Sequence, residues 1–409
     1  MRKLSNLRRA LFSCPTIAAL GILAHGVFNN NEAHAQEAPP TCASLGFTNP
    51  VYLAGSTAVQ SVINAIGPKL ATAATPVQLV YTSAGSCDGV NTIVGGLKLS
   101  SNASYWDASG TLGTCSLNAQ AIDIGLADVF PTSCPDITAD ALAGIGDFGG
   151  PVQSMNFAVP AAASATSISA SAAYLTIGLG ATGGTDWPKP ELYAFRNFQS
   201  GTETMIAKAI NVPTSKWPAA ADKGSAGNVV TALKTPTGPA DQTIGILASN
   251  QTDDNRDTIK RLAFQGYDQT CAYYPDSSLS SKDKANVRDG TYAIWGPLHM
   301  LTKVDTGGVP TDPQAKALLD IMLDKAPVTG VDIVDLEITA NTVPQCAMHV
   351  QRTSELGAPT AYVPDTSCSC YFDSKRGDAS ACTACTTETA ATVCPAGHKA
   401  CNHGYCEVK

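Results

Sequence analysis

Residues 193–203 read YAFRNFQSGTE, and in this stretch a strand gives way to a helix. The first three residues are aromatic or apolar and strand-like. In contrast, the apolar residues within 205–210 recur at helical spacing. The change of period falls on residues 200–202, so we expect their side chains at the start of a helix.

An anion could bind at this helix start. The first N–H groups of a helix have no intrahelical partner, and the helix dipole favours negative charge there. Ser200 and Thr202 add hydroxyl donors around the flexible Gly201, and Arg196 adds a planar charged fork. An ordinary helix cap and a surface arginine would look the same, so this stretch alone leaves both interpretations open.

The order of strand, small polar loop and helix occurs twice more. Residues 51–53 read as a strand and are followed by Ser56, Thr57 and a helix with one apolar face. A second strand, 77–81, leads through Ser86 into another apolar segment. Ligands of open α/β sheets lie beyond the carboxyl ends of the strands. We therefore expect the three loops to converge on one crevice.

A carboxylate ends a further apolar strand, 121–128. Asp128 would repel most anions, but monohydrogen phosphate carries a proton that it can donate to a carboxylate. Fully ionised sulfate has no such proton and would meet only repulsion. Asp128 is thus predicted to select phosphate over sulfate, or else to be an ordinary turn or capping aspartate.

The first 35 residues have the pattern of a secretory signal peptide. Basic residues precede an apolar middle, and the stretch ends in Ala33-His34-Ala35. It holds four of the 26 basic and one of the 34 acidic residues, so the rest of the chain has a net charge of −11. That charge disfavours nucleic acid and anionic membranes as partners. We expect an exported protein, periplasmic or at the cell surface.

Thirteen cysteines follow this leader, and most of them should form disulfides in an exported protein. Seven crowd residues 368–406, where large apolar residues are few, so disulfides are expected to replace a core. The odd number leaves one thiol free or bonded to another chain. The pairing does not follow from the sequence.

Two possible metal sites have structural alternatives. Cys382-x-x-Cys385 with His398 and His403 would suit zinc, although an oxidising compartment favours disulfides. The acidic run 253–257 lacks the spacing and the glycine of a calcium loop and is predicted to be a solvated loop. No metal or other cofactor is expected.

Over about residues 48–330 the chain resembles the periplasmic phosphate-binding proteins of ABC transporters. The resemblance rests on the order of four motifs and on two later stretches. The motifs are Ala54-Gly55-Ser56-Thr57, Gly85-Ser86-x-x-Gly89, Ala127-Asp128 and Arg196-x-x-x-Ser200-Gly201-Thr202. The later stretches are 243–247 and 259–266 followed by 289–296. Cys87 and Asp88 depart from the family pattern, so the second loop could be cross-linked and its binding weakened.

The resemblance implies an α/β, two-lobe periplasmic binding protein fold of type II, with a small disulfide-rich tail added. Crossovers between the lobes are expected at 155–159 and 292–296. The expected parts are a signal peptide at 1–35, lobe one at 42–154 with 290–365, lobe two at 155–289, and a cysteine-rich module at 366–409. The implied phosphate ligands are Ser56, Thr57, Ser86, Asp128, Arg196, Ser200, Gly201 and Thr202.

The function expected from this resemblance is capture of inorganic phosphate between the lobes for uptake by an ABC permease. An enzyme is disfavoured because the chain has no G-x-S-x-G elbow, P-loop or catalytic histidine spacing. The alternative is a cell-surface or matrix protein that keeps the fold and works through its cysteine-rich tail.

Overall fold

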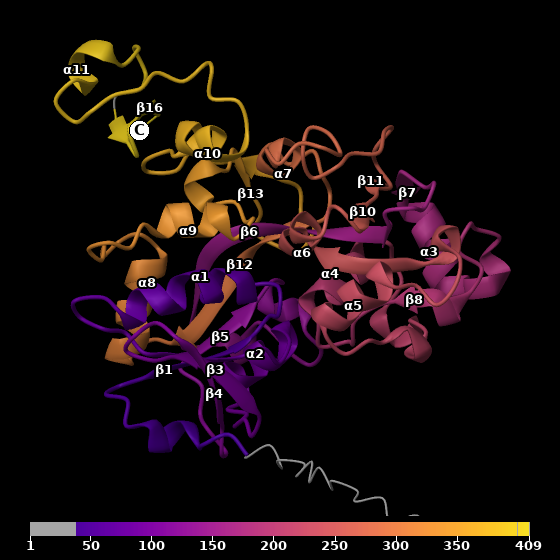
Figure 1. Cartoon of the computed structure of the whole chain (residues 1–409), viewed down its shortest axis with the longest axis horizontal. Coiled ribbons are helices and arrows are strands. Elements are labelled where there is room, and N and C mark those ends of the chain that lie inside the picture. Colours follow the sequence, from indigo (N-terminus) through magenta and orange to yellow (C-terminus); the bar gives the residue numbers. More distant parts are fainter. Residues whose placement is uncertain (1–37, 399, 409) are drawn as a thin grey trace, which may run out of the picture. The chain divides into compact units, whose positions relative to one another are not determined.

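The computed structural model describes residues 38–398 and 400–408, and the predicted signal peptide lies outside them (Figure 1). Pro39–Lys409 form one compact unit. Within the described ranges, no helix is both long and apolar enough to cross a membrane.

A ten-stranded mixed sheet forms the centre of this unit. Its strands follow the order β4-β3-β2-β1-β5-β12-β6-β9-β8, and β10 also pairs with β6. Their bounds are β1 (Val51–Gly55), β2 (Leu79–Thr82), β3 (Asn102–Trp106), β4 (Leu112–Ser116), β5 (Ile124–Ala127), β6 (Ile145–Pro160), β8 (Tyr193–Ala194), β9 (Ile244–Ala248), β10 (Ile259–Arg261) and β12 (Trp295–Lys303).

The parallel part of the sheet sets up the predicted loops. β1 lies between β2 and β5 and is parallel to both. Every residue of β2 and β5 is buried, as expected for parallel strands covered on both faces. Parallel neighbours end at the same edge of a sheet, so the loops that follow β1, β2 and β5 lie together.

β6 joins the two halves of the sheet. Up to Ser154 it pairs antiparallel with β12, and from Met155 onward it pairs with β9 and then β10. The predicted outward crossover, 155–159, therefore lies inside β6, and the predicted return, 292–296, runs into β12. The lobe boundaries themselves remain a prediction.

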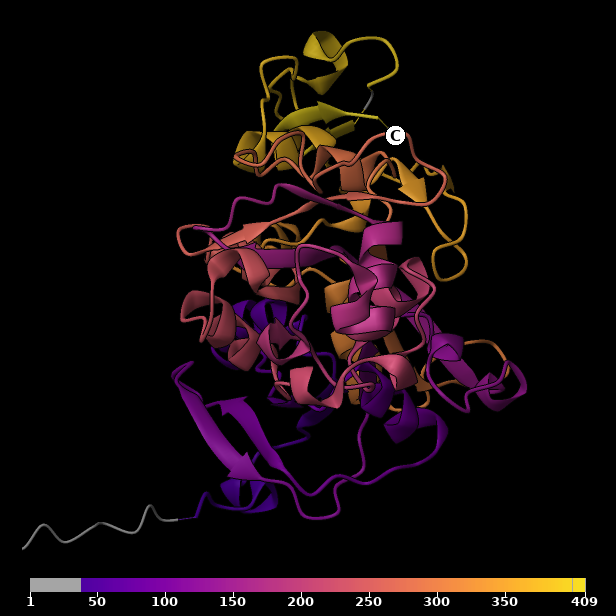
Figure 2. The same cartoon turned by 90° about the vertical axis from the view of Figure 1, so that its right-hand side faces the viewer.

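Helices lie on both sides of this sheet (Figure 1, Figure 2). α1, α2 and α4 follow β1, β2 and β8, as the changes of period predict. Their bounds are α1 (Gln60–Ala71), α2 (Ser86–Val94), α3 (Ala170–Leu179), α4 (Gly201–Ala209), α5 (Ala226–Lys234), α6 (Ser249–Asp254), α7 (Ala285–Arg288), α8 (Pro313–Met322), α9 (Ile333–Thr339), α10 (Ser369–Arg376) and α11 (Ala390–Val393). Short pairs complete the strands: β7 (Ser167–Ser169) with β11 (Ala263–Gln265), β13 (Val350–Gln351) with β14 (Thr360–Ala361), and β15 (Ala400–Asn402) with β16 (Tyr405–Glu407).

The prediction of a solvated loop at 253–257 is wrong at its first residue. Asp253 is buried at the end of α6 and forms ion pairs with Arg256, Arg261 and Lys284. These cations hold the pKa of Asp253 at about 2, against the opposing effect of burial. One of these cations, Lys284, lies 31 residues further along the chain, which local composition does not reveal.

Six disulfides pair twelve of the described cysteines, and Cys271 is exposed and unpaired among them. The expectation that most cysteines form disulfides is confirmed, and Cys271 is the cysteine left over by the odd number. The pairs are Cys42–Cys115, Cys87–Cys134, Cys346–Cys368, Cys370–Cys382, Cys385–Cys401 and Cys394–Cys406.

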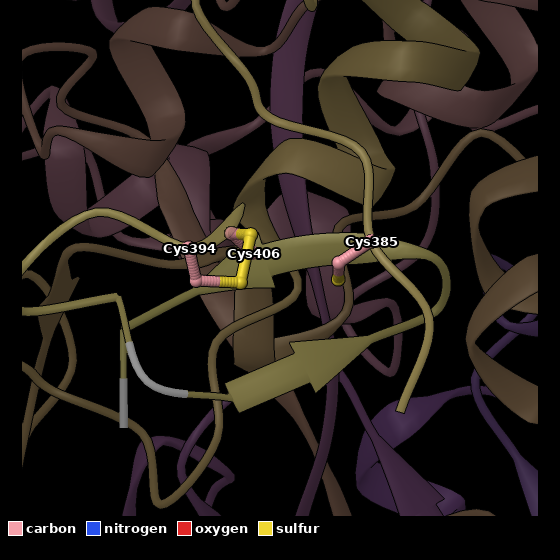
Figure 3. A group of neighbouring side chains, drawn as sticks. All are labelled: Cys385, Cys394 and Cys406. Carbon is pink, nitrogen blue, oxygen red and sulfur yellow. A yellow bond between two sulfur atoms is a disulfide. The ribbon is translucent and has the colours of Figure 1, made fainter. Parts of the chain in front are cut away.

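The disulfides of the tail leave its clustered cysteines unable to bind zinc. The sulfur atoms of Cys385, Cys394 and Cys406 lie within 4.8 Å of one another, which would suit a metal (Figure 3). However, all three are in disulfides and carry no thiolate to donate. Cys382, the other half of the C-x-x-C motif, pairs with Cys370.

The cysteine-rich tail is attached to the main body by more than the chain. Cys368 is bonded to Cys346, just before α10. On α10 itself, Asp373 pairs with Arg288 at 2.5 Å, and the Nε of Arg376 donates to the carbonyl of Ile338 at 3.2 Å. These contacts fix α10 against α7 and α9.

Candidate functional site

The start of α4 is built as the sequence predicts. Ser200 is the N-cap, with an extended backbone, and its Oγ accepts a hydrogen bond from the Glu203 N–H at 3.4 Å. Gly201 and Thr202 are the first helical residues and both are buried. Their N–H groups are among those that a helix leaves without an intrahelical partner.

Asp128 brings the loops after β1, β2 and β5 together. Its Oδ2 accepts hydrogen bonds from the Ser56 Oγ and, at 3.3 Å, from the Ser86 Oγ. No hydrogen bond reaches its Oδ1 from the described residues. Burial raises the pKa of Asp128, and the two hydroxyl hydrogen bonds and Arg196 oppose that rise. One carboxylate oxygen is thus held by hydroxyls, and the other is left for a donor.

Arg196 connects the segment before α4 to the first loop. Its side chain is buried, and one terminal nitrogen donates to the Thr57 Oγ1 at 2.7 Å. Its Nε has no partner among the described residues. Burial lowers the pKa of Arg196, while Asp128 and Glu203 raise it again.

The site has two sides, and they are in contact. Side one consists of the loops with Ser56, Thr57, Ser86 and Asp128, and side two is the segment from Arg196 to Thr202. A Cβ on Gly201 would come within 2.4 Å of the Ser86 Oγ, so only glycine fits there. The Cys87 N–H also donates to the Gln199 carbonyl at 3.0 Å, and the Gln199 amide donates to Asp88 at 3.0 Å.

All eight predicted ligands belong to these two sides. Seven are buried and Thr57 is half-buried. The Thr202 hydroxyl is used weakly, since it donates to the sulfur of Met155 at 3.3 Å. None of the eight lines the cavity of about 330 Å³ beside Arg256 and Arg261.

Two further residues shape the site and were not predicted. Tyr81, on β2, is buried and donates to the Ser56 carbonyl at 2.5 Å, which braces the first loop. Glu203, on α4, is 2% exposed, and its Oε2 has no partner among the described residues. Glu203 lies three residues after Ser200, which is the spacing of a capping box, in which its carboxylate would accept a hydrogen bond from the Ser200 N–H. Here the Ser200 N–H donates to the Asn197 carbonyl instead.

Neither a scan against protein-family models nor a search of curated proteins finds a match to this chain. Solved structures do match. One, described as a phosphate ABC transporter substrate-binding protein from Clostridium perfringens with bound phosphate, has a TM-score of 0.50 and 15% identity. The match covers 72% of this chain and 99% of that one.

Two other solved structures match more loosely. A human phosphate binding apolipoprotein has a TM-score of 0.48 and 13% identity, over 72% of this chain and 90% of that one. An ABC-type phosphate transport receptor from Vibrio cholerae has a TM-score of 0.45 and 16% identity, over 72% and 99%.

The similarity to the Clostridium perfringens protein concerns the fold. Together with the mixed sheet and its crossing strand β6, it confirms the predicted α/β periplasmic binding protein fold. The disulfides between residues 346 and 406 confirm the cysteine-rich C-terminal region.

Proposed function

We propose that this protein, which has a periplasmic binding protein fold, captures inorganic phosphate between the two sides of the site described above. The backbone N–H groups at the start of α4, the hydroxyls of Ser200 and Thr202 and the Arg196 guanidinium hold the phosphate oxygens from side two. The hydroxyls of Ser56, Thr57 and Ser86 complete the shell from side one.

The arrangement of Asp128 supports phosphate over a fully ionised oxyanion such as sulfate. Its Oδ2 is occupied by two serine hydroxyls, whereas its Oδ1 accepts nothing among the described residues. A carboxylate beside a bound anion is tolerated only when the anion brings a proton, and monohydrogen phosphate does. The hydroxyl of the bound monohydrogen phosphate donates a hydrogen bond to Oδ1, which gives that oxygen its missing donor.

Binding, without catalysis, is the role that we assign to this site. The Clostridium perfringens protein, which shares the fold, is described as a substrate-binding protein with bound phosphate. We therefore propose delivery of the captured phosphate to an ABC permease from outside the cell membrane. The six disulfides support a location in an oxidising compartment. A cell-surface or matrix protein that uses its tail as the contact is the alternative.

Removal of the buried guanidinium tests the proposed site. Ligand-stripped protein titrated calorimetrically with phosphate should bind one equivalent, and Arg196→Ala should weaken binding by about 10- to 100-fold, as expected for loss of charge-assisted hydrogen bonds. Lys189→Ala, at an exposed cation after α3, is the control and should bind like the unaltered protein. Equal affinities of Arg196→Ala and Lys189→Ala would contradict the proposal.

A further inference from the structure

Glu203 is a buried carboxyl group next to the proposed site that the binding scheme does not use. It is the third residue of α4, directly after the three residues that hold the anion. Its side chain is 2% exposed, and its Oε2 has no hydrogen-bond partner among the described residues. A buried carboxylate without partners is costly, whereas a neutral carboxyl group is much less so.

The charges around Glu203 also favour its neutral form. Asp222, which follows the short 3-10 helix Ala219–Ala221, raises its pKa, and Arg196 is the cation that lowers it. Burial lowers the pKa of Arg196, whereas the carboxyl groups of Asp128, Glu203 and Asp222 all raise it. One buried cation thus serves three carboxyl groups before any anion arrives.

The other elements packed against α4 bring little compensation. β9 has no ionisable side chain, and the aspartate of β6, Asp147, lies in the half of that strand that pairs with β12. The 3-10 helix Thr214–Lys216 adds the exposed Lys216, and α4 itself adds Lys208 in its last turn. Burial, with Asp222, therefore raises the pKa of Glu203 to about 8.

We propose that Glu203 is a proton-linked positioning residue for Arg196: its neutral carboxyl group leaves the Arg196 charge to the bound phosphate, and loss of its proton weakens phosphate binding. This inference rests on the proposed function. When Glu203 is ionised, it competes with phosphate for the guanidinium, whose Nε has no other partner among the described residues. Phosphate binding above neutral pH is then accompanied by uptake of a proton from solvent onto the Glu203 carboxylate.

The direction of the pH dependence of phosphate affinity follows from the change in the Glu203 pKa on binding. A bound dianion raises the Glu203 pKa further, so the complex holds more protons than the free protein above the free-state pKa of about 8. Affinity therefore falls as pH rises through that range. Phosphate itself is almost wholly monohydrogen there, so its own titration does not obscure the effect.

Calorimetric titration with inorganic phosphate tests the inference. Between about pH 8 and about pH 9.5, in buffers of small and large ionisation enthalpy, the unaltered protein should take up a fraction of a proton, and its dissociation constant should rise about tenfold. Glu203→Gln should bind phosphate with no proton uptake and a nearly constant affinity. Glu191→Gln, which removes an exposed carboxylate before β8, should behave like the unaltered protein.

Proton uptake that persists unchanged in Glu203→Gln would overturn the inference while leaving phosphate binding intact. A second readout needs no ligand: near neutral pH, the infrared C=O stretch of protonated carboxyl groups should be weaker in Glu203→Gln and in Glu203→Met than in the unaltered protein, where buried groups such as Glu337 also contribute. Equal intensity of this band in the unaltered protein and both variants would also overturn the inference. Two neutral variants guard against one that fails to fold. If neither the unaltered protein nor any variant binds phosphate, the proposed function itself is wrong.

Discussion

At the residue scale, the site depends on one position that tolerates no side chain. Gly201 lies where side two meets side one, and an added Cβ would come within 2.4 Å of the Ser86 Oγ and 3.2 Å of the Asp128 Cβ. Its role is therefore close packing, because Gly201 is a helical residue and is not among the described glycines with positive φ.

Gly201→Ala should separate the two sides and weaken phosphate binding by about tenfold or more, since the hydroxyls and Arg196 could no longer contact one ligand together. Gly227→Ala is the matched control, because it lies near the start of α5 with nothing closer than 3.9 Å. That variant should keep its phosphate affinity and gain slight helix stability. Calorimetry gives the affinities, and tight phosphate binding by Gly201→Ala would contradict the closed geometry.

At the element scale, a disulfide joins the loop after β2 to the loop after β5. Cys87 is the second residue of α2, directly after Ser86, and Cys134 ends the 3-10 helix Pro131–Ser133 that follows Asp128. The departure from the family pattern at Cys87 is therefore a cross-link, as the sequence suggested. The carboxylate of Asp88, the other departure from the family pattern, accepts a hydrogen bond from the Gln199 side chain.

Replacement of both Cys87 and Cys134 by alanine should lower the free energy of unfolding by about 4 kcal/mol, as expected when a 47-residue loop is released. It should also weaken phosphate binding, because Ser86 and Asp128 lose their fixed spacing. The paired replacement of Cys370 and Cys382 releases a 12-residue loop, so it should cost about 3 kcal/mol and leave binding unchanged. Denaturant unfolding and calorimetry check both. Equal phosphate affinities in the two double variants would count against this role of the disulfide.

The elements that were predictable are those with a local signal. β1, β2, β5, β8 and the helices after three of them follow from hydrophobic period and from small polar residues at strand ends. The β3–β4 hairpin was not predicted, because most residues of both strands are exposed or half-buried, which leaves no clear alternation of apolar and polar residues.

Long-range packing explains the other failures. The burial of Glu203 depends on β6 and β9 packing against α4, and that of Asp253 on cations up to 31 residues away. The eight predicted ligands could be placed because a resemblance supplied their order. The sequence alone contained the three loops but not the contacts between them.

At the scale of the whole molecule, the net negative charge of the chain disfavours binding of an anion. The chain after the predicted leader has a net charge of −11, which repels phosphate and sulfate alike. Under the proposed function, selectivity then comes from the site between the two sides, whose residues are almost all buried. That function also requires the two sides to separate when an anion enters, by a hinge motion.

The most direct test of the central claim is the ratio of phosphate to sulfate affinity, measured by calorimetry in Asp128→Asn and in the control Asp186→Asn, at an exposed aspartate. In the unaltered protein and in the control, phosphate should bind far more tightly than sulfate. Asp128→Asn should lose phosphate affinity and gain sulfate affinity, so that the ratio falls by about 100-fold, the product of two effects of roughly 1.4 kcal/mol each. An unchanged ratio in Asp128→Asn would contradict the assignment of the phosphate proton to Asp128.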